Sequence, residues 1–257
     1  MEKEHLLTMD ILNVEELNKS FGGVVATKNV SFSVANGEHL AIIGPNGAGK
    51  TTLFNLLTGF YKPTSGKIYF DGHSIGNKTD FERTHLGISR SFQITSLFNQ
   101  LSVMENAVLA LQGTKKYRYQ IMRDIKSNGE LMAGVEKLLR SMMLWELRNE
   151  PVHCISYGQQ RKLEIALSMA SEPRLLLLDE PSCGLTTAES EELSRMICNL
   201  EKHITVICVA HDMDLVFSIA SRILVLHYGE IITEGTPEQI KASSKVKEIY
   251  MGSEETE

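Results

Sequence analysis

The sequence predicts an α/β fold, a doubly wound and mainly parallel β-sheet with a helical subdomain inserted into it. Short apolar strands alternate with helical segments in the second half of the chain, which implies parallel crossover connections. A glycine-rich run, residues 44–52, stands between an apolar strand and a helix, as a phosphate-binding loop does. A helical stretch over residues 96–171 separates this run from the later strands.

Composition and charge are those of an ordinary globular chain with room for one large domain. The net charge of -6 gives no support for a nucleic-acid partner, which usually shows as a clustered basic excess. No stretch approaches the roughly 20 apolar residues that span a bilayer, and the start does not resemble a signal peptide. The 4 cysteines form no Cys-x-x-Cys pair, which favours a reduced compartment. We therefore expect a soluble, cytoplasmic protein, for which any membrane role would have to come through a partner.

The first ninety residues read mostly as short strands. Alternation of apolar and polar residues, or a continuous apolar run, marks each strand, and glycine or proline marks each turn. The expected elements are alternating strands over 11–16 and 30–34, an apolar strand over 38–43, a helix from Thr51 to about Thr58, and a strand over 67–70.

The remainder of the chain begins with the helical block, in which a polar, basic piece over residues 115–128 is expected at the surface. Strand and helix signals alternate after it, and the acidic tail over residues 252–257 is expected to be disordered. The expected strands are 175–178, 205–209 and 222–226, and the expected helices lie near 188–202 and 213–220.

The glycine-rich run itself reads Gly44-Pro45-Asn46-Gly47-Ala48-Gly49-Lys50-Thr51-Thr52. Such a loop aims several backbone N–H groups at one point, and the following helix adds the partial positive charge of its N-terminus. Lys50 can then reach the β- and γ-phosphates of a nucleotide, and the Thr51 hydroxyl can ligate Mg²⁺. For this motif taken alone, an ordinary glycine turn before a helix remains the alternative.

A second acidic element suits such a loop, because a bound Mg²⁺ and an attacking nucleophile both have to be positioned. Four leucines, residues 175–178, predict a buried strand that ends in Asp179 and Glu180, at the sheet edge where α/β proteins bind ligands. Asp179 would fix the metal shell, and Glu180 would act as general base or orient the water. A buried strand ending in a solvated acidic turn is the alternative.

A further helix start lies between these two elements. Ser156 is a suitable N-cap, and Gly158 lets backbone N–H groups approach an anion closely. One nucleotide cannot easily use two such helix starts. The simplest geometric answer is that a second copy of the fold presents this one to the nucleotide held by the first.

These motifs, in this order, resemble those of the nucleotide-binding ATPases of ABC transporters, and the resemblance covers essentially the whole chain. It implies a P-loop NTPase with the ABC ATPase fold: a RecA-like parallel-sheet core, an antiparallel β-subdomain and the inserted α-helical subdomain, in a single domain over residues 1–257. The matching features are Gly44–Thr52 for the Walker A loop, Gln93 for the Q-loop, Ser156–Gln160 for the signature, Asp179 and Glu180 for Walker B, residues 182–185 for the D-loop, His211 for the switch histidine, and Phe21 for the aromatic residue that stacks on adenine.

The resemblance also implies a role for each residue, with ATP and Mg²⁺ as cofactors. Phe21 is the weakest of these assignments, since a lone aromatic residue near a strand end is as often part of the core. The implied roles are phosphate neutralisation for Lys50; the Mg²⁺ shell for Thr51, Gln93 and Asp179; activation of water for Glu180; γ-phosphate sensing for His211; and contact with the ATP of the opposite subunit for Ser156, Gly158 and Gln159.

Three departures from the family pattern stand out. Ile155 and Tyr157 occupy signature positions where Leu and Gly are preferred, and Tyr157 is tolerable if its side chain faces away from phosphate. Thr186 replaces the usual acid of the D-loop. The helix after the signature reads Ile165-Ala166-Leu167-Ser168 and lacks a common arginine. None of these changes removes a catalytic group from the expected site.

A narrower resemblance is to importer ATPases for branched-chain amino acids, of the type paired with a second, distinct ATPase. It implies a subunit on the inner face of the cell membrane that forms a homo- or heterodimer, binds two permease subunits and serves a solute-binding protein indirectly. A permease groove is expected near residues 93–105, where Phe92, Ile94, Leu97 and Phe98 are either contacts or core. The narrower resemblance rests on residues 21–23, 55–66, 156–161, 211–213 and 235–240.

Three other functions stay open at this stage. One is the ATPase of a lipid or lipopolysaccharide exporter, which shares much of the C-terminal pattern. Another is a soluble ABC ATPase acting in translation or DNA repair, which usually carries tandem cassettes or long coiled coils. The third is a small-molecule kinase, which would need neither the signature nor His211.

Overall fold

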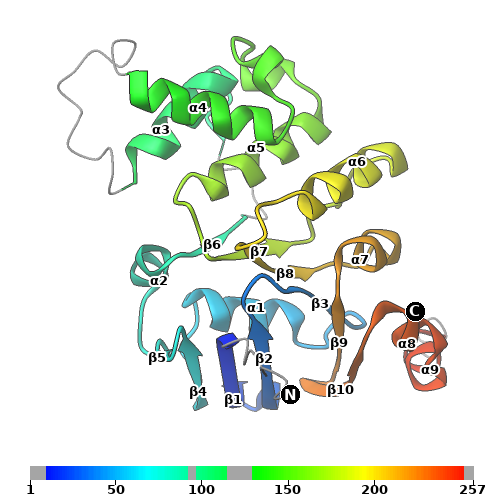
Figure 1. Ribbon diagram of the computed structural model, residues 1–257. Coiled ribbons are helices and arrows are strands. Elements are labelled where there is room, and N and C mark those ends of the chain that lie inside the picture. The colour runs from blue at the N-terminus through cyan, green and yellow to red at the C-terminus, as the bar shows by residue number, and fades with distance from the viewer. Residues whose placement is uncertain (1–9, 92–96, 115–128, 252–257) are drawn as a thin grey trace, which may run out of the picture.

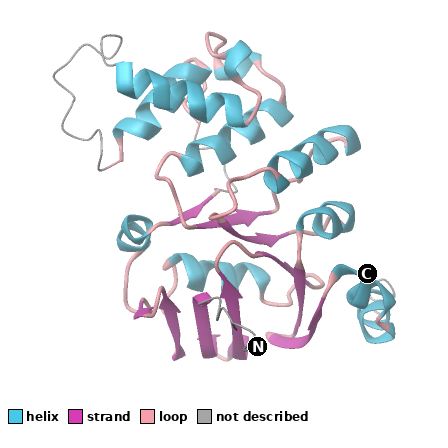
Figure 2. Ribbon diagram, viewed as in Figure 1, coloured by secondary structure: helices cyan, strands magenta, loops and turns pink. Residues whose placement is uncertain are grey.

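The computed structural model describes residues 10–91, 97–114 and 129–251, which form two β-sheets and a set of covering helices (Figures 1 and 2). The first sheet is four-stranded and antiparallel, in the order β2-β1-β4-β5. Its strands are β1 (Asp10–Phe21), β2 (Val24–Ala35), β4 (Ser65–Phe70) and β5 (His73–Ser74).

The second sheet has six strands in the order β10-β9-β3-β8-β7-β6. Neighbours run parallel from β9 through to β6, and β10 pairs with β9 antiparallel. The parallel core and the antiparallel β-subdomain of the predicted fold are thereby confirmed. The strands are β3 (His39–Ile43), β6 (Ile88–Arg90), β7 (Leu175–Asp179), β8 (Thr205–Val209), β9 (Arg222–His227) and β10 (Glu230–Gly235).

Helix α1 (Lys50–Thr58) lies between the two sheets, and the other helices of the core cover the opposite face of the parallel sheet. Successive residues of a strand face opposite sides, so each central strand contributes to two cores. In β3, Leu40 and Ile42 pack with α1 and the antiparallel sheet, whereas Ala41 and Ile43 pack with the helical side. Burial on both faces explains why these strands read as continuous apolar runs.

The helices on the far side of the parallel sheet fall into two groups (Figure 1). Helices α3, α4 and α5 lie together at the top of the view, and α6 and α7 lie against each other beside the sheet. Five described helices begin with a reciprocal capping box, at Thr79, Ser102, Ser156, Thr186 and Thr236, which fixes where each one starts. The helices are α2 (Asp80–Leu86), α3 (Val103–Gln112), α4 (Gly129–Ser141), α5 (Tyr157–Met169), α6 (Thr187–Cys198), α7 (Met213–Ile219), α8 (Pro237–Ala242) and α9 (Ser244–Met251), with short 3₁₀ turns over Trp145–Leu147 and Val152–Cys154.

Several element boundaries differ from those predicted. Strands β1 and β2 are each 12 residues long, about twice the predicted length, because register shifts interrupt the alternation of apolar residues. Glu16 and Asn29 take positive φ at these shifts. Helix α6 ends at Cys198, four residues before the predicted end. Helices α2, α8 and α9 and strands β5, β6 and β10 were not predicted, while residues 115–128 and 252–257 lie outside the described residues.

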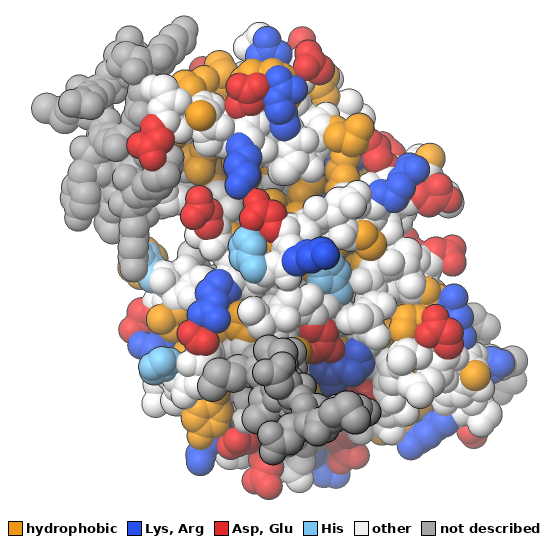
Figure 3. All heavy atoms as spheres, in the orientation of Figure 1, with side chains coloured by type: hydrophobic (Ala, Val, Ile, Leu, Met, Phe, Trp, Pro, Cys, Tyr) orange, Lys and Arg blue, Asp and Glu red, His pale blue; other side chains and the backbone are white. Residues whose placement is uncertain are grey.

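The surface shows charges of both signs interspersed over the face drawn in Figure 3. Acidic and basic side chains alternate there over the sheet and over the helices, so this face presents no extended field of one sign. Within the described residues, every helix is too short or too polar to cross a membrane.

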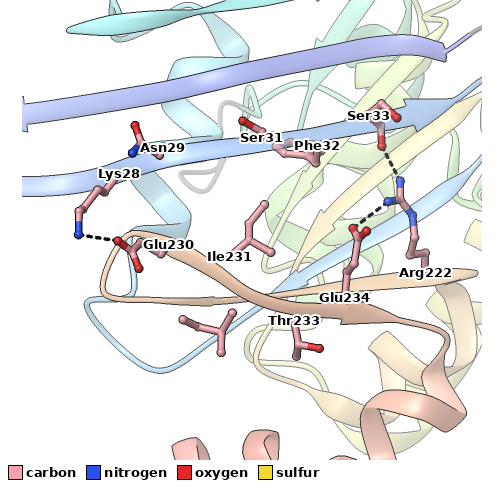
Figure 4. Close-up of a pocket in the computed structure, with 11 residues that line it drawn as sticks. Lys28, Asn29, Ser31, Phe32, Ser33, Arg222, Glu230, Ile231, Thr233 and Glu234 are labelled. Carbon is pink, nitrogen blue, oxygen red and sulfur yellow. Dashed lines mark hydrogen bonds and ion pairs between the residues drawn. The ribbon is translucent and has the colours of Figure 1, made fainter.

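Arg222 at the start of β9 ties the two sheets together (Figure 4). Its guanidinium donates to the backbone carbonyl of Ser33 on β2 and forms ion pairs with Glu38, at 2.7 Å, and Glu234, at 3.0 Å. These contacts border a groove of about 510 Å³ between β2 and β10, whose other end is closed by the ion pair of Lys28 with Glu230. No predicted site residue lines this groove.

Arg83 of α2 is the most deeply buried cation of the β-subdomain, with a relative exposure of 1%. Its guanidinium donates to four backbone carbonyls: those of Leu56 and Leu57 at the end of α1, and those of Ile75 and Lys78. Burial lowers the pKa of Arg83 to about 10, so the group stays charged at neutral pH. One side chain thus satisfies the open end of α1 and fixes α2 beside it.

We predict that Arg83→Met destabilises the fold by about 3 kcal/mol, because it removes four hydrogen bonds from a buried, charged donor to backbone carbonyls. Urea denaturation measures the loss. The matched control is Lys28→Met, which removes an exposed ion pair and should leave the denaturation midpoint unchanged. Equal midpoints for the two variants would contradict the role given to Arg83.

Candidate nucleotide site

The glycine-rich loop joins β3 to α1 and passes closely between two other strands. A Cβ atom on Gly44 would lie 2.1 Å from the carbonyl oxygen of Leu226 on β9, and one on Gly49 would lie 2.2 Å from that of Ala26 on β2. Both neighbours are backbone atoms that cannot turn aside. Gly47 and Gly49 also take positive φ, of 77° and 98°. The glycines are therefore required by the path of the loop itself.

Exposure to solvent varies along the rest of the loop. Asn46, Gly47 and Thr51 are exposed, whereas Ala48 and Lys50 are buried. Pro45 and Thr52 are half-buried. The hydroxyl-bearing residue at the helix start is thus open to solvent, while the lysine lies inside the loop.

Lys50 is only 6% exposed. Its ammonium donates to the carbonyl oxygens of Gly44, at 2.7 Å, and Pro45, at 2.9 Å. Burial lowers the pKa of Lys50, and the nearby carboxylates of Glu180 and Asp179 oppose that shift. A phosphate at the loop would be met by a cation that already lies among the loop's own backbone groups.

Asp179 ends β7 with no exposed side-chain surface. One carboxylate oxygen, Oδ2, accepts from Arg90 on β6 at 2.7 Å, and Arg90 also donates to Asn55 of α1 at 2.8 Å. Burial raises the pKa of Asp179, with Arg90 opposing the shift. The other oxygen, Oδ1, is buried and has no hydrogen-bond partner among the described residues. A buried acceptor of this kind fits a water molecule of a Mg²⁺ shell.

Glu180 follows with a backbone φ of 45°, in the left-handed region, which costs about 1–2 kcal/mol for a residue with a side chain. Its N–H donates to the carbonyl of Val209 on β8, at 2.7 Å. Its carboxylate Oε1 lies 3.3 Å from Nε2 of His211, which follows β8. Both side chains keep access to solvent, with 30% and 44% exposed. Two strand ends therefore bring together an acid and a histidine 31 residues apart in the sequence.

The predicted signature residues start α5. Ser156 caps the helix by accepting from the Gln159 N–H at 3.2 Å, and the Gln159 side chain accepts from the Ser156 N–H at 2.8 Å. Gly158 is buried against α6, where an added Cβ would lie 2.4 Å from a Glu189 carboxylate oxygen. The Tyr157 ring lies over Gly184 of the predicted D-loop. Tyr157 thus contacts the D-loop segment of its own chain.

Phe21 ends β1 and is 41% exposed. Its ring meets Tyr61 edge-on, with centroids 5.1 Å apart, and the Lys19 ammonium lies 4.9 Å from the Phe21 centroid. Phe21 is therefore a surface aromatic in a small cluster rather than a core residue. A purine could stack on such a surface.

The structure brings together most of the predicted site, and the interactions among Lys50, Asp179, Glu180 and His211 all link separate elements. Gln93 lies outside the described residues, as do Phe92 and Ile94 of the expected permease groove. Of the other two groove residues, Leu97 belongs to the core and Phe98 is 58% exposed. Sequence reasoning assigned no site role to Asn55, Tyr61, Arg90 or Arg161. Asn55, Tyr61 and Arg161 lie in segments quoted for the narrower resemblance, and Arg90 lies in none of them.

A glycine-constrained phosphate loop beside an acidic strand end defines the chain as a P-loop ATPase domain. A family model described as ABC transporter matches residues 27–183. The chain belongs to the ABC transporter family, which confirms the predicted family and the predicted class of enzyme.

Relatives match over nearly the whole chain. The high-affinity branched-chain amino acid transport ATP-binding protein BraF of Pseudomonas aeruginosa is 38% identical, over 96% of this chain and 99% of its own length. The probable branched-chain amino acid transport ATP-binding protein LivG of Archaeoglobus fulgidus is 33% identical, over 97% of this chain and 98% of its own.

Solved structures agree with the fold. The ADP conformation of an ATP-binding cassette from an ABC transporter has a TM-score of 0.84 and 32% identity, covering 95% of this chain and 100% of that one. A dimeric cassette in a post-hydrolysis state, bound to ADP and Pi, has a TM-score of 0.73 and 28% identity, covering 88% and 98%. ADP, a product of ATP hydrolysis, defines the conformation of the first cassette and is bound together with Pi in the second.

We predict that Arg90→Met destabilises the protein by about 3 kcal/mol at pH 8, because it leaves the Asp179 carboxylate buried without a partner. The loss should shrink towards pH 5. A raised native pKa means that the folded state binds more protons than the unfolded state, so stability falls as pH rises from the ordinary Asp value, 3.8, towards the native one. Removing Arg90 raises the pKa of Asp179 further, so stability continues to fall up to a higher pH.

Chemical denaturation at several pH values measures this effect. The matched control is Arg174→Met, which removes an arginine–aspartate pair of similar geometry from the surface, where Arg174 and Asp71 are 44% and 54% exposed. The control should change the midpoint little at any pH. A loss for Arg90→Met that did not depend on pH would rule out Asp179 as its cause.

Proposed function

We propose that this chain is the ATP-hydrolysing subunit of an importer for branched-chain or related amino acids. The observation that carries the proposal is the Glu180–His211 pair, 3.3 Å apart, at the same sheet edge as Asp179 and the lysine of the phosphate loop. The substrate class rests on the relatives, which carry branched-chain amino acid transport in their names and match over nearly their full length.

In this proposal the loop from Gly44 to Thr52 holds the phosphates of ATP. Its N–H groups and the α1 N-terminus face the phosphate chain, and Lys50 turns from the loop carbonyls to the β- and γ-phosphates. Thr51, Gln93 and Asp179 hold Mg²⁺, and the orphaned Asp179 oxygen supports this role. A bound Mg²⁺ neutralises charge on the phosphate oxygens. Phe21 offers its exposed ring to the adenine.

Glu180 then acts as the general base, or orients the attacking water, and His211 contacts the γ-phosphate. The open, adjacent positions of the two side chains support this assignment, since a base has to reach the water whose proton it takes. The left-handed backbone conformation of Glu180 also supports its assignment as the base, because strained backbone conformations at strand ends often fix a reactive side chain.

The signature residues complete the site of a second subunit. Ser156, Gly158 and Gln159 lie at the start of α5, where the partial positive charge of the helix N-terminus suits the γ-phosphate of an ATP held opposite. Dimeric cassettes among the structural relatives support this arrangement. We propose that the partner is an identical or a related ATPase subunit, that the pair sits on two permease subunits at the inner face of the cell membrane, and that a solute-binding protein delivers the solute to them.

The first test is Glu180→Gln, which keeps the side chain's shape and removes its basicity. We expect the rate of ATP hydrolysis to fall at least about 100-fold, while ATP still binds and dimers accumulate in analytical ultracentrifugation. Glu191→Gln, the same change at an exposed residue of α6, is the control and should hydrolyse ATP normally. Undiminished turnover by Glu180→Gln would exclude it as the base.

The second test addresses the solute. Deleting the gene should abolish uptake of labelled leucine, isoleucine and valine, and the wild-type chain should restore it whereas Glu180→Gln should not. Membrane pull-down should recover two permease subunits and a second ATPase. Normal amino-acid uptake with a defect in lipid or lipopolysaccharide export would support the exporter alternative, and recovery of ribosomes or DNA would support a soluble ATPase.

A further inference from the structure

Arg161 lies in the second turn of α5 and is 6% exposed. Its guanidinium donates to the backbone carbonyl of Glu180 at 2.8 Å and to that of Pro181 at 3.3 Å. These carbonyls belong to the residue proposed as the base and to the residue after it. A side chain of one proposed ATP-binding element therefore holds the main chain of another.

Glu180 is a residue whose backbone has to be held. Its φ of 45° is unfavourable for a side-chain-bearing residue, so neighbouring contacts have to fix it. Strand β8 holds the N–H, through the carbonyl of Val209 at 2.7 Å. Arg161 holds the carbonyl, which also accepts from the Cys183 N–H at 3.1 Å. The peptide groups on both sides of the Glu180 Cα are thereby fixed, and the direction of its side chain with them.

A buried ion pair fixes Arg161 in turn. Its Nη1 donates to Glu164 Oε2 at 2.7 Å, and the two side chains are 6% and 4% exposed. Tyr157, one turn before Arg161, lies over Gly184. Residues 157, 161 and 164 are spaced to lie on one face of a helix, and this face covers the segment from Glu180 to Gly184.

We propose that Arg161 is a positioning residue for ATP hydrolysis, which fixes the backbone of Glu180 and so the place of its carboxylate. This inference rests on the proposed function of Glu180 as the base. It adds that α5, whose N-terminus faces the ATP of the opposite subunit, and the base of the chain's own site move as one body. Closure on one ATP is then transmitted to the base at the other through the hydrogen bond of the Arg161 guanidinium to the Glu180 carbonyl.

The test replaces the buried pair as a unit, Arg161→Met with Glu164→Leu, since removing Arg161 alone would leave a buried carboxylate without its partner. We expect kcat of the full chain to fall about 10- to 100-fold, with the KM for ATP changed by less than about twofold, because a misplaced base affects the chemical step and not binding. The matched control is Lys162→Met with Glu192→Leu, which removes the next ion pair of α5, at 2.5 Å, and should leave kcat within about twofold.

A double-mutant cycle then separates positioning from a general structural role. If Arg161 acts through Glu180, the apolar pair should cause no further loss when Glu180→Gln is already present, as measured by single-turnover hydrolysis. The same fold-loss in both backgrounds, or an equal loss in the control pair, would overturn the proposal. Normal turnover by the Glu180→Gln single variant would overturn the assignment of Glu180 as the base. That result is measured without any change at Arg161, so it is distinguishable from failure of the positioning role.

Should the apolar pair fail to fold, Arg161→Lys serves in the same cycle. It keeps a positive charge beside Glu164 but cannot span the carbonyls of Glu180 and Pro181 with a planar fork. We expect a smaller fall in kcat that again disappears in the Glu180→Gln background. Wild-type kcat for a folded Arg161→Lys would then refute the positioning role.

Discussion

A carboxylate with no exposed surface ends the strand β7, and much of the surrounding structure serves to keep it there. Burying the charge of Asp179 is unfavourable, as the raised pKa of this group shows. Arg90 supplies a direct partner, and the charge of Arg161 acts in the same sense. The Asp179 carboxylate also stabilises the charged form of Lys50, from the phosphate loop, against the effect of burial on its pKa. Cations from β6, α5 and α1 are thus arranged around one strand end.

This arrangement links parts of the fold that have separate cores. Helix α1 belongs to the core between the two sheets, whereas α5 belongs to the core on the helical side. Arg90 joins β7 to α1 through Asn55, and Arg161 joins β7 to α5 through the Glu180 carbonyl. A nucleotide held by α1 and a partner subunit facing α5 would therefore meet at adjacent residues of a single strand. The sheet between the two cores is rigid because both of its faces are packed.

The backbone at this strand end carries strain that the tertiary structure balances. Glu180 takes a left-handed conformation held by β8 on one side and by α5 on the other. His211 reaches the Glu180 carboxylate from the neighbouring strand, so the distance between them is set by the pairing of β7 with β8. The β7–β8 register brings Asp179 opposite Val209, so the residues that follow the two strands also lie near each other.

The sequence by itself determined the α/β class, the phosphate loop, the acidic end of β7 and the start of α5, because each depends on local chemistry. The glycine spacing of residues 44–49 and the run of four leucines can be recognised within a few residues, although the contacts of Gly44 with Leu226 and of Gly49 with Ala26 are long-range. Tertiary structure alone decided the partners. The sequence assigned no role to Arg90, Arg161 or Tyr61, because their contacts are with residues 35, 19 and 40 positions away that folding brings beside them. The lengths of β1 and β2 also escaped prediction, because bulges reverse the alternation on which a strand is recognised. Side-chain periodicity reports which face is buried, but it does not report what lies against that face.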